Sequence, residues 1–500
     1  MTHRLRDLRA TRVLLVLWIA SLSSTGLFAT EATQVGTPTK AVPSFDVAWV
    51  LAEDPGIGFE GSPTYCDLDG DGQDEAIVAV GSGAAPLPAD PAYVQAVDPR
   101  TGTRLWRSAQ GDAGFAAPLC RDVDGDGVLD VLTAGRFGDL RALSGLDGSV
   151  VWSLNALNPG AIGADANTYS PVSAPERPDL VFVSTGGGVE PSDGPRNPGA
   201  VLALDLDGTV VARWDEPNQA EIYSTPAVLA LDRRGRNLLL VVGSGGETLP
   251  GSLHFLLYNT RFEVFIPYAA VPSTCAEGGY VASPVFGDTT GDRFAIPEVV
   301  AADFCGSVAV FDLLGRELWR QGTAWPYTIA NPLLSDLDAD GVFDVAVASI
   351  AVNPSLPDTF PLIDASLETF DGATGAPLWS TPLKLPPFAS PAAADIDGDG
   401  VEDVWVATQN FFLPSEITVY SGADGSELVA YGAVSWAGSP IVGDADRDGS
   451  IDVLVMDAPL VFAPPFPPVS TILLELPGVA FDPAASWSGF RGASSDGYRR

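Results

Sequence analysis

Apolar and polar residues alternate along most of the chain in short runs, and one phrase separates these runs eight times. The phrase is a small residue, a proline, a short apolar stretch, a loop that is acidic in most copies, and a second β-rich stretch. Its prolines recur on average about every 54 residues, at Pro63, Pro118, Pro171, Pro226, Pro284, Pro332, Pro391 and Pro440. Period-two alternation predicts β-strands, and self-similarity at this period predicts a repeat architecture.

A second alternating phrase follows most copies, such as YVQAVDPRTGTRLWRS from residue 93 and SVAVFDLLGRELWRQ from residue 307. It alternates around a D-x-x-G or G-x-D-G turn, which is typical of a β-hairpin. Each repeat therefore holds four strands, A to D, with the loop of the first phrase between A and B. We predict an all-β fold, an eight-bladed β-propeller of four-stranded antiparallel blades over residues 45–492. The segment FDVAWVLA (45–52) is expected to complete the last blade, so that N- and C-terminal strands close the ring.

The N-terminus has the pattern of a secretory signal peptide over residues 1–29. Four arginines precede an apolar run from Val13 to Leu22, and small residues surround Ala29. An uncleaved membrane anchor is the alternative. No later stretch could cross a bilayer, so we expect a secreted, periplasmic or cell-surface protein without a transmembrane segment after cleavage. Residues 30–44 are expected to form a linker and residues 493–500 a tail.

The chain carries a formal net charge of −38. Without residues 1–29, 22 basic and 63 acidic residues remain, a net charge of −41. Such a charge repels nucleic acid and attracts cations, so we expect no nucleic-acid partner. Much of the acidity lies in short Asp/Gly loops, which points to metal sites.

Five acidic loops place carboxylates at positions 1, 3, 5 and 9. Hard oxygen ligands of this number suit Ca²⁺, and we predict several structural Ca²⁺ ions. An EF-hand is excluded because position 12 is Val or Thr and β sequence follows the loop. The predicted ligands are Asp67, Asp69, Asp71 and Glu75; Asp122, Asp124, Asp126 and Asp130; Asp336, Asp338, Asp340 and Asp344; Asp395, Asp397, Asp399 and Asp403; and Asp444, Asp446, Asp448 and Asp452.

Three repeats depart from this pattern. The third and fourth, at 174–179 and 231–236, have no series of acidic residues. The fifth is a weaker candidate, because Asp288, Thr290 and Asp292 match but Glu298 follows late. Because some repeats lack ligands, we interpret the metal loops as structural rather than sensory.

The remaining side chains give fewer candidates. Cys275 and Cys305 are expected at one end of blade five, where a disulfide is plausible. Cys66 and Cys120 differ by one residue in register, which we interpret as opposite faces, so that pair is disfavoured. His254 is expected to be a packed or surface strand residue. The B–C loops carry Phe411, Phe412, Phe462 and Phe466, which form a possible ligand rim or else cover the blade edges.

The D-x-D-G-D-G loops resemble the FG-GAP/VCBS repeats of integrin-α-like propellers. The T-G…L-W hairpins resemble the PQQ-like repeats of eight-bladed quinoprotein-type propellers, and the tail from Trp487 to Arg491 is similar to a motif of such proteins. The second resemblance implies an enzyme in which basic and amide groups hold an acidic quinone beside a catalytic Asp and Ca²⁺.

Propellers host many unrelated activities, so the residues must decide between functions. We predict a non-catalytic binding or adhesion module for an extracellular protein or glycan. A quinoprotein-type dehydrogenase and a polysaccharide lyase are the alternatives. Both need cationic groups, and Lys, Arg and His are scarce in the mature chain. The oligomeric state does not follow from the sequence.

Overall fold

The computed structural model describes most of the chain from residue 44 to residue 487. The described ranges are 44–55, 62–80, 93–109, 116–135, 140–158, 160–162, 167–187, 197–246, 249–274, 276, 278–292, 294–352, 363–387, 389–408, 415–434, 439–457, 468–482 and 486–487. The predicted signal peptide and the Phe411, Phe412, Phe462 and Phe466 rim lie outside these ranges. Within them, no helix is long and apolar enough to cross a membrane.

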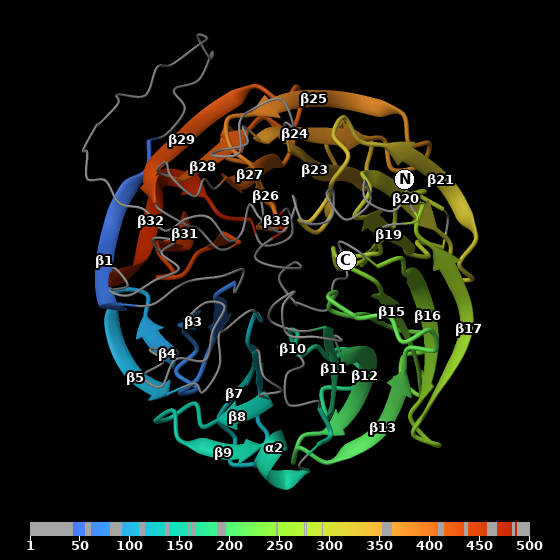
Figure 1. Cartoon of the computed structure of the whole chain (residues 1–500). Helices are drawn as coiled ribbons and strands as arrows, with labels where there is room; N and C mark the ends of the chain where they lie inside the picture. Colours follow the sequence, from blue (N-terminus) through green and yellow to red (C-terminus); the bar gives the residue numbers. More distant parts are fainter. Residues whose placement is uncertain are drawn as a thin grey trace, which may run out of the picture.

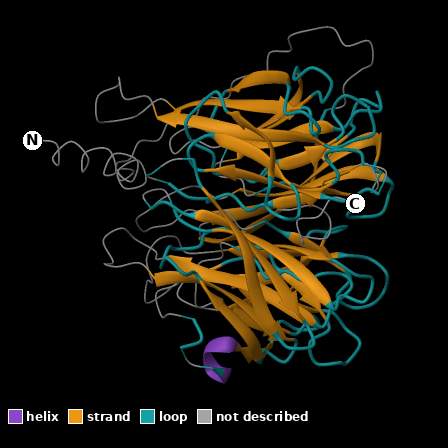
Figure 2. Ribbon diagram, turned by 90° about the vertical axis from the view of Figure 1, so that its right-hand side faces the viewer, coloured by secondary structure: helices purple, strands orange, loops and turns teal. Residues whose placement is uncertain are grey.

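Eight antiparallel sheets form a closed ring, which confirms the predicted eight-bladed propeller (Figure 1). The first four blades are β2 (Thr64–Cys66), β3 (Glu75–Val80), β4 (Tyr93–Asp98) and β5 (Thr103–Ala109); β6 (Leu119–Arg121), β7 (Asp130–Ala134), β8 (Leu140–Leu143) and β9 (Val150–Ser153); β10 (Asn167–Thr168), β11 (Leu180–Gly187), β12 (Asn197–Asp205) and β13 (Val210–Asp215); and β14 (Ala227–Ala230), β15 (Asn237–Gly243), β16 (Ser252–Asn259) and β17 (Val264–Pro272). One short helix, α2 (Leu154–Leu157), follows β9 (Figure 2).

The remaining blades continue around the ring. They are β18 (Val285–Gly287), β19 (Glu298–Asp303), β20 (Ser307–Phe311) and β21 (Glu317–Gly322); β22 (Leu333–Ser335), β23 (Asp344–Val352), β24 (Ile363–Phe370) and β25 (Pro377–Leu383); β26 (Ala392–Ala394), β27 (Asp403–Thr408), β28 (Ser415–Tyr420) and β29 (Glu427–Val434); and β30 (Ile441–Gly443), β31 (Ser450–Asp457), β32 (Pro468–Ala480) and β1 (Asp46–Pro55). The A strands lie toward the centre and the D strands at the perimeter (Figure 1).

Both ends of the described chain join the last two blades. Strand β1 pairs with β32 from Asp46↔Glu475 to Pro55↔Pro468 and supplies the outer strand of blade 8, as predicted. The C-terminal strand β33 (Ser486–Trp487) instead adds a fifth strand to blade 7 by pairing with β26. The predicted outer boundaries, at residues 45 and 492, remain a prediction.

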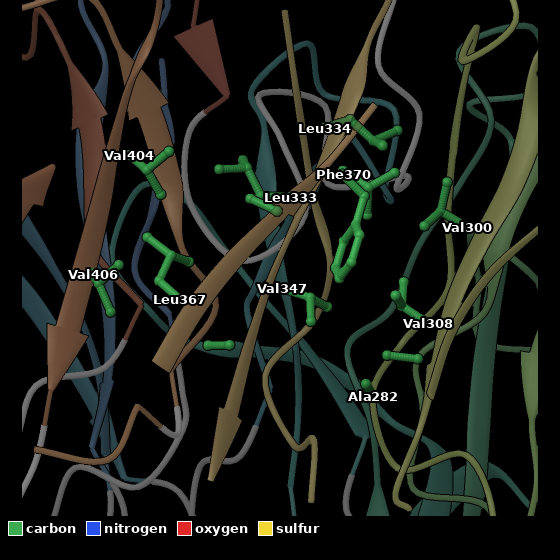
Figure 3. Packing of buried hydrophobic residues seen from close by; sticks show 14 of the residues in the cluster. Ala282, Val300, Val308, Leu333, Leu334, Val347, Leu367, Phe370, Val404 and Val406 are labelled. Carbon is green, nitrogen blue, oxygen red and sulfur yellow. The ribbon is translucent and has the colours of Figure 1, made fainter. Parts of the chain in front are cut away.

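Apolar side chains pack between neighbouring blades rather than within one. One cluster joins blades 5, 6 and 7 and includes Val300, Leu333, Val347, Phe370 and Val404, all at most 5% exposed (Figure 3). Because every blade is covered on both faces, the B strands are buried along their length, as in β27. The D strands at the perimeter mix buried and exposed positions along most of their length, as in β5.

The residue before the repeat proline links several pairs of consecutive blades. The Ser283 Oγ accepts a hydrogen bond from the Thr225 N–H at 2.9 Å, and the Asn331 Oδ1 accepts one from the Ser283 N–H at 2.6 Å. The Ser439 Oγ likewise accepts the Ser390 N–H at 3.0 Å. These side chains satisfy backbone donors that no strand partner reaches, so the repeat phrase holds the inner ring together.

Tryptophans on the D strands link the outer parts of consecutive blades. The indole N–H groups of Trp106, Trp319 and Trp379 donate to carbonyls in the C–D turn of the next blade. Blade 4 has no tryptophan at this position, and there the Tyr268 hydroxyl donates to the Leu313 carbonyl. The aromatic residues that end the second sequence phrase are therefore contacts between blades.

Cys66 and Cys120 form a disulfide with a Cα–Cα distance of 6.4 Å, contrary to the sequence interpretation. The two residues belong to neighbouring blades, and neighbouring blades pack face to face. To meet, the Cys66 side chain must project from the face of blade 1 that packs on blade 2, and the Cys120 side chain from the face of blade 2 that packs on blade 1. These are opposite faces of equivalent sheets, so a difference of one residue in register favours the bond. Cys305 is also disulfide-bonded, while its predicted partner Cys275 lies outside the described residues.

Candidate metal centres

Each acidic loop connects strands A and B and folds around its own carboxylates. In blade 7, Asp395 accepts the N–H groups of Gly398 and Gly400 at 2.6 and 3.0 Å. Both glycines have positive φ angles, +71° and +91°, which other residues adopt only with strain. The Asp397 carboxylate accepts the Asp399 N–H at 3.0 Å. The glycines of the motif thus allow the turn that gathers the aspartates.

The turns bring the predicted ligands together in at least four of the five loops. In each, three residues offer carboxylate oxygens that all lie within 4.8 Å of one another. The groups are Asp67, Asp69 and Asp71; Asp122, Asp124 and Asp130; Asp336, Asp338 and Asp340; and Asp395, Asp397 and Asp399. Asp371 from the C–D turn joins Asp338 and Asp344 in a further group, which the sequence did not suggest.

In blades 2, 6 and 7 the position-9 carboxylate connects the loop to the C–D turn of its blade. In blade 6, the Asp344 Oδ2 accepts the Leu337 N–H at 2.9 Å, and its Oδ1 accepts the Gly372 N–H at 2.9 Å. The Gly372 carbonyl in turn accepts the Trp319 indole N–H of blade 5 at 2.6 Å. A series of hydrogen bonds therefore runs from the metal loop through the C–D turn to the neighbouring blade. Asp130 and Asp403 make the same contacts with Gly145 and Gly422.

Burial at these positions shifts the acids toward their protonated form. Desolvation raises the pKa of Asp403 to about 8 and that of Asp344 to about 7, although two backbone N–H bonds oppose the change in each. The same cause raises the pKa of Glu75 to about 6. A bound cation favours the ionised form of nearby carboxylates, so metal binding would reverse these shifts.

Blade 8 has carboxylate oxygens that lack a partner. Asp452 is 1% exposed, and its Oδ1 has no hydrogen-bond partner, although its Oδ2 accepts the Ala445 N–H at 2.7 Å. The Oδ1 of Asp444 is also buried without a partner. A buried carboxylate oxygen without a partner is costly, and a cation between these two residues would satisfy both.

The weaker candidate in blade 5 uses its residues differently. The Asp288 Oδ1 accepts the Gly291 N–H at 2.8 Å, as in the complete loops. The Thr290 hydroxyl, however, donates to the Glu298 Oε1 at 3.1 Å, and the Glu298 Oε2 accepts the Thr289 N–H at 2.9 Å. Glu298 therefore performs the position-9 role despite the insertion, and Thr290 is engaged within the loop.

His254 lies in a buried polar cluster between blades 3 and 4. Its Nε2 lies 2.9 Å from the Ser244 Oγ and 3.3 Å from the Glu216 Oε1, and its ring packs on Trp214 with centroids 4.9 Å apart. Serine and carboxylate meet the same ring nitrogen, which differs from a catalytic triad, where they meet opposite nitrogens. The packed interpretation of His254 is thus the better one.

Residues 90–248 match a family model described as outer membrane protein assembly factor BamB. This span begins before β4 and ends after β15, which is less than half of the chain. The match supports the PQQ-like part of the resemblance, whereas the FG-GAP/VCBS part stays a prediction. No curated protein matches the chain.

Solved structures of several functions share the fold. The europium-containing methanol dehydrogenase has a TM-score of 0.58 at 13% identity, covering 86% of this chain and 93% of its own. The quinohemoprotein alcohol dehydrogenase from Comamonas testosteroni has 0.57 at 15%, covering 88% and 77%. The C-terminal WD40 domain of Sif2 has 0.52 at 12%, covering 88% and 100%. These identities show the fold alone.

The described residues opposite the metal loops do not fit an acidic quinone. The buried carboxylates Glu216, Glu221 and Asp303 lie there, each at most 1% exposed. Of the arginines, Arg320 contacts Glu317 and Ser307, and Arg107 contacts Gln95. These three buried carboxylates would repel a negatively charged cofactor, so they do not fit a site for one.

Proposed function

We propose that this protein is an exported, calcium-stabilised β-propeller that acts as a non-catalytic binding scaffold for an extracellular protein or glycan. The observation that carries the proposal is the sequence match of residues 90–248 to a protein assembly factor, because it rests on sequence whereas the dehydrogenase likeness rests on fold. The buried carboxylates Glu216 and Asp303 opposite the metal loops support it, because both accept hydrogen bonds from other groups of the protein.

Calcium would act as a structural element of this scaffold. Removal of the ions leaves mutually repelling carboxylates in five turns, so binding free energy becomes folding free energy. We expect EDTA to lower the melting temperature markedly, and CaCl₂ to restore it where the same concentration of MgCl₂ does not. Metal analysis after dialysis against CaCl₂ should find three to five ions per chain, as the loops predict. An unchanged melting temperature in EDTA would refute the structural role.

The binding surface is expected on the rim opposite the metal loops, where the B–C loops carry Phe411 and Phe412. Glycan-array screening of the purified chain, beside a variant with both residues changed to Ser, tests this expectation. Binding that the variant loses at an unchanged melting temperature supports the rim. Binding that the variant retains would place the ligand elsewhere.

A quinoprotein-type dehydrogenase is the second candidate, because two of the structural neighbours are such enzymes. The protein can be incubated with pyrroloquinoline quinone and either CaCl₂ or EuCl₃. Tryptophan fluorescence quenching then reports cofactor binding, and dye reduction with primary alcohols reports turnover. We expect neither signal. Stoichiometric binding with dye reduction would replace the scaffold proposal with the dehydrogenase.

A further inference from the structure

Blades 4 and 5 carry more than half of the exposed large apolar side chains found among the described residues. Most of these side chains belong to A–B and C–D turns and to the strands β17 and β21, which lie at the perimeter of the ring (Figure 1). Phe262 and Leu314, each in a C–D turn, are 71% and 61% exposed. We name the exposed set the apolar sector; it comprises Leu231, Phe262, Ile266, Ile296, Leu314 and Leu318.

The two blades form one continuous surface at this sector. The Tyr268 hydroxyl on β17 donates to the Leu313 carbonyl in the C–D turn of blade 5. A shallow hollow of ≈ 420 Å³ lies between the blades, lined by Glu176 of blade 3 and by apolar residues that include Leu231, Ile296 and Leu313. An exposed aromatic residue, Phe262, and an apolar hollow therefore occur on the same sector.

The sector is close to neutral in a strongly acidic protein. Its four turns, 231–236, 260–263, 288–297 and 312–316, carry formal charges of +2, 0, −1 and 0. The five acidic loops, in chain order, carry −5, −4, −4, −5 and −3. Even with two positive charges per bound Ca²⁺, the sum for these loops stays near −11. In an eight-membered ring, blades 4 and 5 are directly opposite blades 8 and 1, which bear acidic loops (Figure 1).

Charge decides which partner fits this surface. Two copies of a chain of charge −38 repel each other on most faces. They repel least where both are neutral, and contact through the sector places the acidic loops of both copies far apart. A lipid bilayer laid on the turn-bearing end would instead meet the acidic loops of the other blades. Pairing between the edge strands is hindered because Pro267 and Pro272 interrupt β17.

The exposed apolar area of the sector is also large enough for a protein–protein interface. Six side chains, each about half exposed at roughly 150–200 Å² apiece, give on the order of 500 Å² of apolar surface. A standard interface of about 800 Å² per partner contains a similar apolar area. Patches of this size on a single chain commonly mark an interaction site.

We propose that a second copy of this chain docks on the apolar sector to form a two-fold dimer. In a two-fold interface the same pair of residues meets twice, once in each direction. Phe262 of each copy therefore enters the hollow beside Ile296 of the other copy. This inference is independent of the proposed scaffold function and of calcium occupancy.

Sedimentation velocity of the mature protein in CaCl₂ tests the proposal. We expect twice the monomer mass at micromolar concentration, with dimerisation maintained or strengthened by NaCl because salt screens the residual repulsion. Phe262→Asp and Leu314→Asp should each raise the dissociation constant at least tenfold. The matched control is Leu146→Asp, in the C–D turn of blade 2, because Leu146 is also 61% exposed. This control should leave the dimer intact, and all three variants should keep the melting temperature of the monomer.

Four outcomes would overturn the proposal. They are a wild-type monomer up to about 100 µM, a dimer that both sector variants retain, a dimer that Leu146→Asp disrupts equally, and a dimer that NaCl dissociates. Flotation with vesicles of phosphatidylcholine and phosphatidylglycerol distinguishes the competing occupant. Sector-dependent vesicle binding by a monomer would assign the surface to a membrane.

Discussion

The contact between Trp319 and Gly375 allows the linkage between blades to be measured. Trp319 on β21 is 8% exposed and lies over the C–D turn of blade 6. A Cβ added at Gly375 would lie 2.6 Å from the Trp319 Cδ2, closer than real Cβ atoms come. Gly375→Ala therefore adds a steric collision between blades to the cost of its positive φ angle, +71°.

Gly478→Ala isolates the cost of the φ angle. Gly478 has φ +80° and no heavy atom within 4 Å of an added Cβ. An alanine in this left-handed region costs about 1–2 kcal/mol, and overpacking adds about 1–3 kcal/mol. With an unfolding entropy of about 2.1 cal/mol/K per residue, 1 kcal/mol corresponds to roughly 1 °C in a ring of this size. We expect melting points lower by about 1–2 °C for Gly478→Ala and about 2–5 °C for Gly375→Ala.

Differential scanning calorimetry of a double-mutant cycle attributes the difference to the tryptophan. In a Trp319→Leu background, Gly375→Ala should cost no more than Gly478→Ala does in the wild type, because the indole ring is gone. Equal costs of Gly375→Ala in the two backgrounds would refute the packing explanation. The same result would remove the physical reason for reading the aromatic residues as contacts between blades.

Three further predictions concern the same network. Replacing Cys66 and Cys120 by Ala opens a loop with a sequence separation of 54, which should cost about 4 kcal/mol, and wild-type protein in reductant should melt no higher than this variant because reductant also opens the Cys305 disulfide. Gly372→Ala places a Cβ 1.9 Å from the Phe343 carbonyl oxygen and should lower the melting temperature more than Gly341→Ala, whose Cβ meets no atom within 4 Å. Hydrogen-exchange mass spectrometry in EDTA should show faster exchange at the A–B turns of blades 1, 2, 6, 7 and 8 than in CaCl₂, with blades 3 and 4 unchanged; uniform acceleration around the ring would contradict local metal sites.

The eight-bladed ring could be predicted because the same sequence pattern recurs in every blade. Eight copies of one phrase define eight blades, and the unpaired strand at 45–52 completes the count, so even the closing strand β1 followed from the sequence. The acidic loops were predictable for a similar reason, since residue spacing within one turn determines which carboxylates can meet. Blade 5 was harder because an insertion separates Asp292 from Glu298, although the structure restores the contact.

Contacts between blades were harder to predict from the sequence. The alternation of apolar and polar residues shows which side chains share one face of a sheet, but it does not show which residues of the neighbouring sheet they contact. The Cys66–Cys120 bond required knowledge that faces of opposite sense meet around a ring. The role of Gly372 depends on three segments, since it receives the Trp319 indole from blade 5 while donating to Asp344. The apolar sector likewise arises from turns that are separated in sequence and become adjacent only when blades 4 and 5 pack together.

In the A–B loops that lack the acidic ligands, arginine side chains lie beside the remaining carboxylates. In blade 3, the Arg177 guanidinium donates two hydrogen bonds to Asp179, at 2.7 and 2.6 Å, and these bonds lower the pKa of that carboxyl. In blade 4, the Asp232 carboxylate accepts the N–H groups of Arg234 and Asn237 and lies 3.3 Å from the Arg236 Nε. A guanidinium thus neutralises these turns where the acidic loops would need a cation. Arginine in the turns of blades 3 and 4 thus supplies positive charge that the acidic loops would have to take from a cation, and in blade 4 it lowers the negative charge beside the apolar sector.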